Sequence, residues 1–336
     1  MATNPALPDG PKPRAWQAEL RDAVRDVAEL ARLLELPLGV VGARVTQASP
    51  FPLLVPRGFV ARMRKRDPAD PLLLQVLPLA AEHTVPEGYS ADPLGEQAIV
   101  RAGLLKKYAG RALLIASGAC PVHCRYCFRR SFPYQAQLAA RADWSSAVRE
   151  LESAPDVEEV ILSGGDPLSL SNRRLAALLK MLESISSLRR VRIHTRFPIM
   201  IPERIDRGLL AVLGATPLQT IIVVHANHAR EIDSAVAGAM QALKHSVDQL
   251  LNQSVLLRGV NDCVDALVAL SERLFECGAL PYYLHMLDPV AGAAHFAVED
   301  SVAIELMCEV RARLPGYLVP RLVREVPGQS SKSLIT

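Results

Sequence analysis

The chain has 336 residues, 50% of them hydrophobic, with 38 basic and 35 acidic side chains and a net charge of +3. This length allows one large domain or two ordinary ones, and so small a net charge gives no case for nucleic acid or an anionic membrane as partner. No apolar run approaches the roughly 18 residues of a membrane span, and the opening residues lack the apolar segment of a signal peptide. We therefore expect a soluble, cytoplasmic protein.

The first part of the chain, residues 1–95, is expected to form a helical and irregular N-terminal region. Apolar side chains recur there at helical spacing, at Trp16, Leu20, Val24, Val27 and Leu34. Residues 37–95 are rich in proline and show no strand alternation, which predicts irregular structure.

From residue 96 to residue 336, short β-prone segments alternate with amphipathic helical ones. The expected strands are residues 111–117, 158–163, 190–195, 220–225, 254–259 and 280–285. Helical patterns lie between them at 144–153, 172–185, 231–251 and 265–277. Strands that alternate with helices form a parallel sheet, so we predict an α/β fold: a partial (β/α)6 barrel with an N-terminal helical extension. Functional residues in such folds follow the carboxyl ends of the strands.

Three cysteines follow the first expected strand. Cys120, Cys124 and Cys127 have the spacing C-x-x-x-C-x-x-C. A structural zinc site would need a fourth ligand, such as His123, and no second Cys-x-x-Cys pair is present. A four-iron cluster normally has one thiolate per iron, so three thiolates would leave one iron open to a ligand. The spacing therefore favours an iron–sulfur cluster over zinc.

The segment SGGDP at 163–167 follows the second expected strand. A glycine pair lets backbone approach a ligand closely, although such a segment is also common as a plain turn between a strand and a helix. Its position beside the cysteines favours the first interpretation.

The cysteine spacing, with Tyr126 before the last cysteine, resembles the radical S-adenosylmethionine (SAM) superfamily. Seven ordered segments further resemble the lysine 2,3-aminomutase family: KKYAGRALL, CRYCFRR, LSGGDPL, HANHAREI, NQSVLLRGVND, PYYLHMLDP and VPGQSSKS. Moving an amino group from carbon 2 to carbon 3 requires breaking an unactivated C–H bond, which a carbon radical can do and a side-chain base cannot. The resemblance implies three cofactors that carry these steps: a [4Fe–4S] cluster, SAM and pyridoxal 5′-phosphate (PLP).

The resemblance also implies a role for particular residues. The three cysteines would hold the cluster, and SAM would be contacted by Gly164, Gly165, Asp166, His225 and Gln253. Lys332 would be the catalytic lysine that binds PLP covalently, and PLP would also be contacted by Lys107, Tyr108 and Arg111. Arg129 would bind the carboxylate of the substrate L-lysine, and Asp288 and Glu325 would bind its side-chain ammonium.

Each of these residues also has a plainer interpretation. A lysine four residues from the end of the sequence is ordinarily solvated, and residues 107–111 could be a basic loop. His225 and Gln253 could be polar residues of the core, and the remaining charges could lie on the surface. The chain also departs from the family at Glu325, where an aspartate is expected, and at 329–331, where glycines are expected.

The sequence ends before the segment that binds zinc in longer members of the family, so Cys263 is expected to be a free cysteine without zinc. This short form resembles the branch that makes (R)-β-lysine for attachment to elongation factor P. Expected partners are L-lysine, an electron donor of the flavodoxin or ferredoxin type and a second copy of the chain, with an indirect link to elongation factor P. The alternatives are an aminomutase for another amino acid, such as glutamate or arginine, and a zinc-stabilised RNA-binding module.

Overall fold

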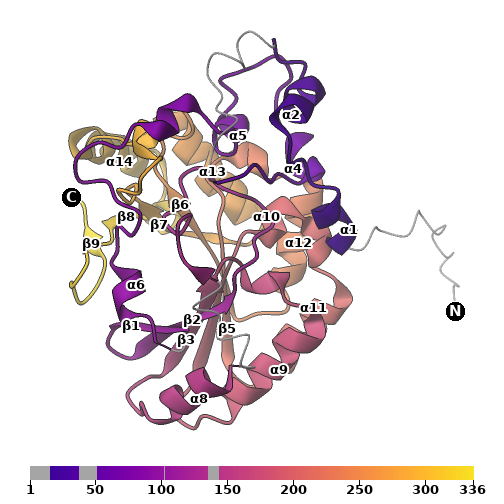
Figure 1. The fold of residues 1–336 in the computed structure, drawn as a ribbon, viewed down its shortest axis with the longest axis vertical. Helices are drawn as coiled ribbons and strands as arrows, with labels where there is room; N and C mark the ends of the chain where they lie inside the picture. Colours follow the sequence, from indigo (N-terminus) through magenta and orange to yellow (C-terminus); the bar gives the residue numbers. More distant parts are fainter. Residues whose placement is uncertain (1–15, 38–50, 102, 135–143) are drawn as a thin grey trace, which may run out of the picture.

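The computed structural model describes residues 16–37, 51–101, 103–134 and 144–336. Their main feature is an open sheet whose nine strands follow one another in chain order (Figure 1). The strands are β1 (Leu104–Tyr108), β2 (Arg111–Ser117), β3 (Glu159–Gly164), β4 (Arg190–Thr195), β5 (Gln219–Val224), β6 (Gln249–Val255), β7 (Leu280–His285), β8 (Arg321–Arg324) and β9 (Ser333–Leu334). Strands β2 to β8 pair in parallel, whereas β1 and β9 pair antiparallel at the two edges.

Each strand from β2 to β7 is followed by a main helix before the next strand begins. The helices are α8 (Ser145–Glu152), α9 (Asn172–Glu183), α11 (Arg207–Ala215), α12 (Ser234–Lys244), α13 (Val264–Glu276) and α14 (Asp300–Arg313). These six βα units confirm the predicted partial barrel. Strand β8 adds a seventh parallel strand, which the sequence analysis did not predict.

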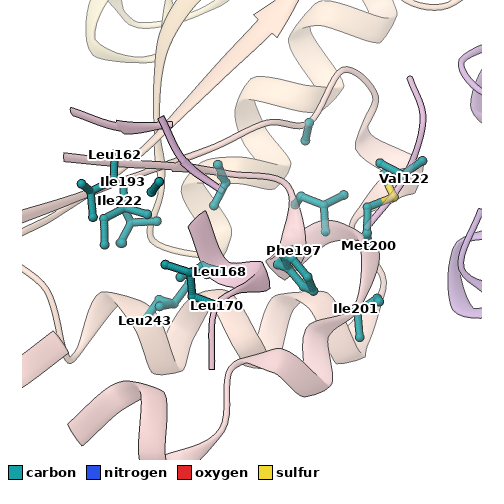
Figure 2. Packing of buried hydrophobic residues seen from close by; sticks show 14 of the residues in the cluster. Val122, Leu162, Leu168, Leu170, Ile193, Phe197, Met200, Ile201, Ile222 and Leu243 are labelled. Carbon is teal, nitrogen blue, oxygen red and sulfur yellow. The ribbon is translucent and has the colours of Figure 1, made fainter. Parts of the chain in front are cut away.

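The core lies between the sheet and these helices. Leu162, Ile193 and Ile222 are aligned across β3, β4 and β5, and all three are fully buried. In Figure 2 they lie in one hydrophobic cluster with Leu243 of α12 and with Phe197 of the short helix α10 (Phe197–Met200). Burying such a side chain contributes about 1.5–3 kcal/mol, so this contact fixes the helices on the outer face of the sheet.

The prediction of a strand at 254–259 was wrong, because the strand begins five residues earlier at Gln249. Helix α12 ends at Lys244, well before the predicted end at residue 251. From Leu250 on, buried and half-buried residues alternate, which is the two-residue period of a strand. The strand ends where Asn261 accepts a hydrogen bond from the Leu257 N–H at 2.8 Å, so the chain turns away there.

The single helical stripe predicted between residues 16 and 34 was also wrong. Two short helices, α1 (Trp16–Arg21) and α2 (Val27–Leu33), replace it. Val24 lies between them and exchanges backbone hydrogen bonds with Val55. Asp26 then starts α2 by accepting hydrogen bonds from two backbone N–H groups, as aspartate does at a helix N-terminus.

The rest of the N-terminal region, predicted to be irregular, contains short helices: α4 (Arg57–Val60), α5 (Pro71–Leu74) and η1 (Ala80–His83). Helix α6 (Glu96–Ile99) follows directly after the region. This region packs directly on the barrel. The rings of Trp16 and Phe197 meet edge to face with centroids 5.5 Å apart, and Arg230 pairs with the buried Asp70 at 2.7 Å. The division of the chain after residue 95 stays a prediction. Among the described residues, no helix is both long enough and apolar enough to cross a membrane.

Candidate active site

Alternate residues of the strands separate an apolar face of the sheet from a polar face. On β4, Val191 and Ile193 are buried among apolar residues, whereas Arg192 and His194 are half-buried. The rings of His194 and His225, at the ends of β4 and β5, meet edge to face at 5.6 Å. Because successive residues of a strand point to opposite faces, the polar side chains line the inside of the open barrel.

The cysteine loop, residues 118–130, leaves the carboxyl end of β2. None of its three cysteines is disulfide-bonded, and all are half-buried. The Cys127 N–H donates to the Cys124 carbonyl at 3.0 Å, which closes a tight turn between them. Val122 is buried in the same hydrophobic cluster as Met200 (Figure 2). An apolar anchor therefore holds the loop that carries the three half-buried cysteines.

Two arginines of the same loop are anchored on the N-terminal region. Arg125 donates from Nε to Glu82 at 2.7 Å, and Arg130 donates from Nη2 to the same carboxylate at 2.6 Å. Burial would raise the pKa of Glu82, but the two guanidinium groups lower it. The carboxylate therefore stays charged and joins the loop to η1.

Burial disfavours the thiolate forms of Cys120 and Cys127. Burial, and then the neighbouring Cys124, raises the pKa of Cys127 to about 11, and burial raises the pKa of Cys120 as well. A metal would therefore displace protons on binding. In the described part of the chain, no three His, Cys, Asp or Glu side chains are grouped to hold a single metal ion.

The glycine pair after β3 lies against the start of the cysteine loop. A Cβ on Gly164 would be 2.4 Å from the Ser117 carbonyl oxygen, and one on Gly165 would be 2.6 Å from the Ala119 carbonyl oxygen. Gly164 also has a φ of +113°, which side chains rarely adopt. The close approach that the glycines permit is therefore, at least in part, to the chain's own backbone.

The carboxylate of Asp166 is engaged inside the protein. It accepts hydrogen bonds from Thr195 Oγ1 at 2.8 Å, from the Arg196 N–H at 2.7 Å and from the Leu168 N–H at 3.0 Å. Burial raises the pKa of Asp166 to about 6. The side chain joins the ends of β3 and β4, and its expected contact with SAM stays a prediction.

Three histidines inside the barrel each have a buried Nε2 atom without a hydrogen-bond partner among the described residues: His194, His225 and His285. Burial lowers the pKa of His225 and that of His285 to about 3, so both rings are neutral near pH 7. A buried polar atom without a partner is costly, so these nitrogens indicate a ligand or water. His225 was expected near SAM, but the other two histidines were not singled out in the sequence.

A chain of ion pairs runs from the cysteine loop to the last predicted site residue. Arg129 donates to both oxygens of Glu96, from Nε at 2.6 Å and from Nη2 at 2.9 Å. Lys107 Nζ lies 2.9 Å from Glu96 and 2.8 Å from Glu325. Lys332 Nζ completes the chain by donating to the second oxygen of Glu325. The structure thus brings together four predicted site residues, from β1, the cysteine loop and the C-terminal segment.

Glu96 of α6 is the member of this chain that the sequence analysis missed. Burial would raise its pKa, but Arg129 and then Lys107 lower it. Glu96 is only 2% exposed. Its buried carboxylate binds the edge of the Arg129 guanidinium that carries Nε. The sequence carries no local signal for this role, because a single acidic residue without a charged partner nearby in the chain predicts a surface charge.

The remaining predicted residues lie around the ion pairs. Tyr108 pairs with Arg111 across the β1–β2 hairpin, and the Arg111 guanidinium lies 5.1 Å from the Tyr108 ring centre. Burial, and then the charge of Glu325, raises the pKa of Asp288 to about 7. Gln253 is half-buried on β6, opposite Tyr283 of β7.

Glu325 itself stays ionised. Burial would raise its pKa, but Lys332 and Lys107 lower it to about 2. Cys263 is exposed at the start of α13 and is not disulfide-bonded.

The residues present suit the three cofactors that the resemblance to the lysine 2,3-aminomutase family implies. Three thiols on one loop suit a cluster with one open iron. The unpartnered Nε2 of His225 can bond a ligand near the glycine pair and the cysteine loop. An amine on Lys332, with Lys107, Tyr108 and Arg111 nearby, supplies a covalent attachment point together with cationic and hydroxyl donors for a phosphate.

Comparison with known proteins gives first the class. Residues 114–268 match the model of the Radical SAM superfamily, and this match covers the chain from β2 into α13. A solved radical SAM methyltransferase from Sphaerobacter thermophilus is a more distant likeness, with 16% identity and a TM-score of 0.46 over 66% of this chain and 68% of that one.

Curated relatives then give the family. The chain is 46% identical to L-lysine 2,3-aminomutase of Escherichia coli, over 96% of this chain and 95% of the relative. It is 44% identical to the enzyme of the same name from Haemophilus influenzae, over 95% of each. The identity is 31% to that of Clostridium subterminale, over 95% of this chain and 77% of the relative. The chain belongs to the L-lysine 2,3-aminomutase family, whose members are isomerases, and this overturns the alternative of an RNA-binding module.

Proposed function

We propose that the protein is a SAM- and PLP-dependent isomerase that converts L-lysine to (R)-β-lysine. The single observation that carries the proposal is the ion-pair chain from Arg129, two residues after Cys127, to Lys332. It joins the expected cluster ligands to the expected PLP lysine through residues of suitable charge.

The contacts of Glu325 support L-lysine as the substrate. In this structure Glu325 binds the ammonium groups of two lysine side chains of the protein, Lys107 and Lys332. The distal ammonium of a substrate lysine is the same chemical group, so the Glu325 carboxylate can bind it in the same way. A substrate with an acidic side chain would instead face Glu325 and Asp288, which repel it.

Arg129 can bind the other end of the substrate. Glu96 takes the Nε and one Nη2 hydrogen, and Ser163 accepts from Nη1 at 2.9 Å. A guanidinium has five N–H groups, so two remain for a substrate carboxylate. Glu96 thus holds Arg129 in one orientation, which limits the entropy lost when the substrate binds.

When bound, the cluster and SAM would supply a carbon-centred radical that removes a hydrogen atom, and PLP would supply a π system conjugated with the substrate's own amino nitrogen, which lets that nitrogen migrate. The residues of the chain bind and orient these groups. Lys332 holds PLP covalently, Lys107, Tyr108 and Arg111 bind its phosphate, and the three cysteines hold the cluster. Before PLP is bound, Glu325 accepts a hydrogen bond from Lys332 Nζ. Gly164, Gly165, Asp166, His225 and Gln253 are proposed to surround SAM.

An anaerobic assay tests this function. The protein is reconstituted with iron and sulfide and then incubated with PLP, SAM, dithionite and L-lysine, and β-lysine is measured by chiral chromatography. The expected result is (R)-β-lysine that forms only when SAM is present. Formation of 5′-deoxyadenosine without β-lysine would keep the radical chemistry and reject L-lysine as the substrate. Absence of both products from a protein with a full iron content would reject the proposal.

The proposal extends to the surroundings of the enzyme. A cluster on reduced thiols requires a reducing compartment, so we place the enzyme in the cytoplasm with a flavodoxin or ferredoxin as electron donor. The resemblance to the branch that supplies elongation factor P suggests that factor as the destination of the β-lysine. Deleting the gene should then lower the mass of elongation factor P by one lysyl group, and an unchanged mass would reject this destination.

A further inference from the structure

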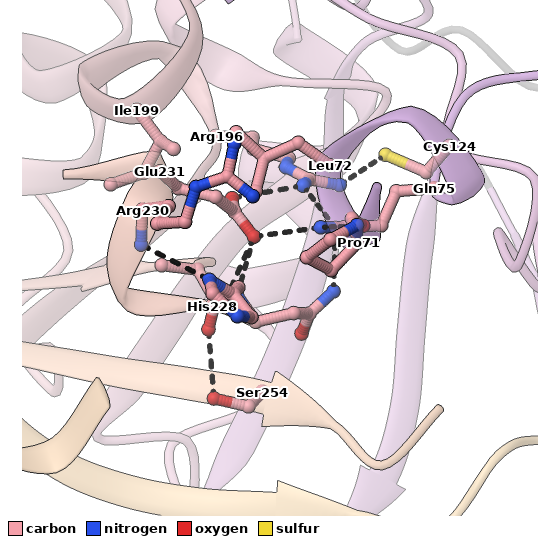
Figure 3. A network of polar contacts seen from close by, with 12 residues as sticks. Pro71, Leu72, Gln75, Cys124, Arg196, Ile199, His228, Arg230, Glu231 and Ser254 are labelled. Carbon is pink, nitrogen blue, oxygen red and sulfur yellow. Dashed lines mark hydrogen bonds and ion pairs between the residues drawn. The ribbon is translucent and has the colours of Figure 1, made fainter. Parts of the chain in front are cut away.

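A buried polar network lies behind the cysteine loop, and the proposed function gives it no role. Figure 3 shows its centre, the guanidinium of Arg196, between the thiol of Cys124 and the carboxylate of Glu231. Arg196 follows β4, and Glu231 closes the short helix η5 (Ala229–Glu231) after β5. Gln75, directly after α5, joins the network from the N-terminal region.

The two terminal nitrogens of Arg196 each donate to two acceptors. Nη1 donates to Cys124 Sγ at 2.7 Å and also to the Tyr126 hydroxyl. Nη2 donates to Gln75 Oε1 at 2.7 Å and to Glu231 Oε2 at 3.1 Å. Arg196 is 6% exposed and Glu231 is fully buried. One face of the cation therefore neutralises a carboxylate, and the other is directed at a thiol.

The partners of Arg196 are themselves held in place. The other oxygen of Glu231 accepts from Gln75 Nε2 at 2.9 Å, from the Asn227 N–H at 2.9 Å and from the His228 N–H at 3.1 Å. The Arg196 N–H donates to Asp166 at 2.7 Å, which fixes its backbone. A charge that is buried and bonded in this way cannot rotate to solvent.

We propose that Arg196 is a positioning residue that raises the reduction potential of the iron–sulfur cluster through Cys124. The inference rests on the proposed function in one respect, the presence of a cluster on the three cysteines. Reduction adds one electron from the donor to the cluster and breaks no bond, so the cluster becomes more negative. Hydrogen bonds and positive charge at a ligand sulfur stabilise that more negative state. Arg196 therefore makes the cluster easier to reduce.

The experiment measures the midpoint potential of the reconstituted cluster by redox titration followed by EPR, with dithionite as the reductant. In Arg196→Gln we expect the cluster to be at least tenfold harder to reduce, which is a shift of about 59 mV to more negative potential for one electron. In Arg196→Lys, which retains the charge, we expect most of the potential to be recovered. A midpoint in Arg196→Gln equal to that of the unchanged protein would overturn the inference.

Arg204 offers a matched control. It is fully buried, but its donors go to the Leu168 carbonyl at 2.6 Å and the Leu170 carbonyl at 3.0 Å. Arg204→Gln should leave the midpoint potential unchanged. A shift equal to that of Arg196→Gln would overturn the inference, because loss of any buried arginine would then have the same effect.

A second variant covers the case in which Arg196→Gln fails to bind a cluster. Glu231→Gln removes the carboxylate that competes for the guanidinium and leaves the contact with Cys124. Its midpoint should move to more positive potential, and no movement would overturn the inference. These titrations need no turnover. The titrations test the role of Arg196, whereas the β-lysine assay on the unchanged protein tests the proposed function, so failure of one is distinguished from failure of the other.

Discussion

The cysteine loop and the segment that carries Lys332 are positioned in different ways. Buried groups hold the loop: Val122 in the core, and Arg196 on Cys124. Lys332, in contrast, follows six residues that are all exposed, 326–331, and is held by a single carboxylate, Glu325. The difference fits the two tasks. Cluster ligands must keep one geometry, whereas a lysine that exchanges PLP with a substrate must be free to move.

The largest expected effect comes from removing the amine of Lys332, in the exposed C-terminal segment. Lys332→Ala should lower β-lysine formation by roughly 10³-fold or more, because Lys332 is the amine proposed to hold PLP covalently. The visible absorbance of lysine-bound PLP should disappear, while the iron content should not change. Retained PLP absorbance with retained activity would show that another lysine binds the cofactor.

The position of the cysteine loop can be disturbed at Gly165, which lies against Ala119. In Gly165→Ala the new methyl group would lie 2.6 Å from the Ala119 carbonyl oxygen, so we expect a loss of about 1–3 kcal/mol in the free energy of unfolding and a lower iron content. Gly214→Ala is the matched control, since nothing lies within 4 Å of its Cβ position on α11, and it should stabilise by about 0.5–1 kcal/mol. Equal stability and iron content in Gly165→Ala and the unchanged protein would disprove the close contact.

Glu96 connects the two regions, so its effect should fall on substrate binding. Glu96→Gln leaves one acceptor where Arg129 now has two. We expect the KM for L-lysine to rise about tenfold, or about 1.4 kcal/mol, with a smaller change in kcat. Glu158→Gln, at a half-exposed carboxylate that pairs with Arg190, should change neither parameter. An unchanged KM in Glu96→Gln would remove Glu96 from the substrate site.

A smaller effect is expected from pH, through the ionisation of Asp288. The pKa of Asp288 is raised to about 7, so below that pH the side chain is mostly neutral and above it mostly a carboxylate. Since the carboxylate attracts the substrate ammonium, the KM for L-lysine should fall as pH rises from about 6 to 8, by at most tenfold per unit. This dependence should be absent in Asp288→Asn, and an identical pH profile in that variant would exclude Asp288 as its source.

The sequence predicted the barrel because its strands and helices each bury one face. Strands at 111–117, 190–195 and 280–285 have the predicted boundaries. The boundary at 244–249 was missed because its polar residues, such as Ser246 and Asp248, also suit the exposed face of a longer helix, and only tertiary pairing selects the strand. The same holds for Val24, whose helical spacing gives way to pairing with Val55.

The candidate site was predictable only where its residues are close together in the chain. The cysteines, and the residues around Tyr108 and Lys332, have local patterns. The contacts of Glu96 with Arg129, of Arg196 with Cys124 and of Glu82 with Arg125 join residues 33 to 72 positions apart. No periodicity encodes such pairs, because they depend on which strand ends the fold places side by side.

The order of the strands has a consequence for how the protein is made. Since the sheet order repeats the chain order, each new strand can add to an edge that already exists. The network on Cys124 is complete once Glu231 has emerged, whereas Lys332 lies 101 residues later in the sequence (332 − 231). At about 5–20 residues per second, the surroundings of the thiols are synthesised roughly 5–20 s before the lysine. If the proposed sites are right, the residues around the cluster site are complete before those around the PLP site.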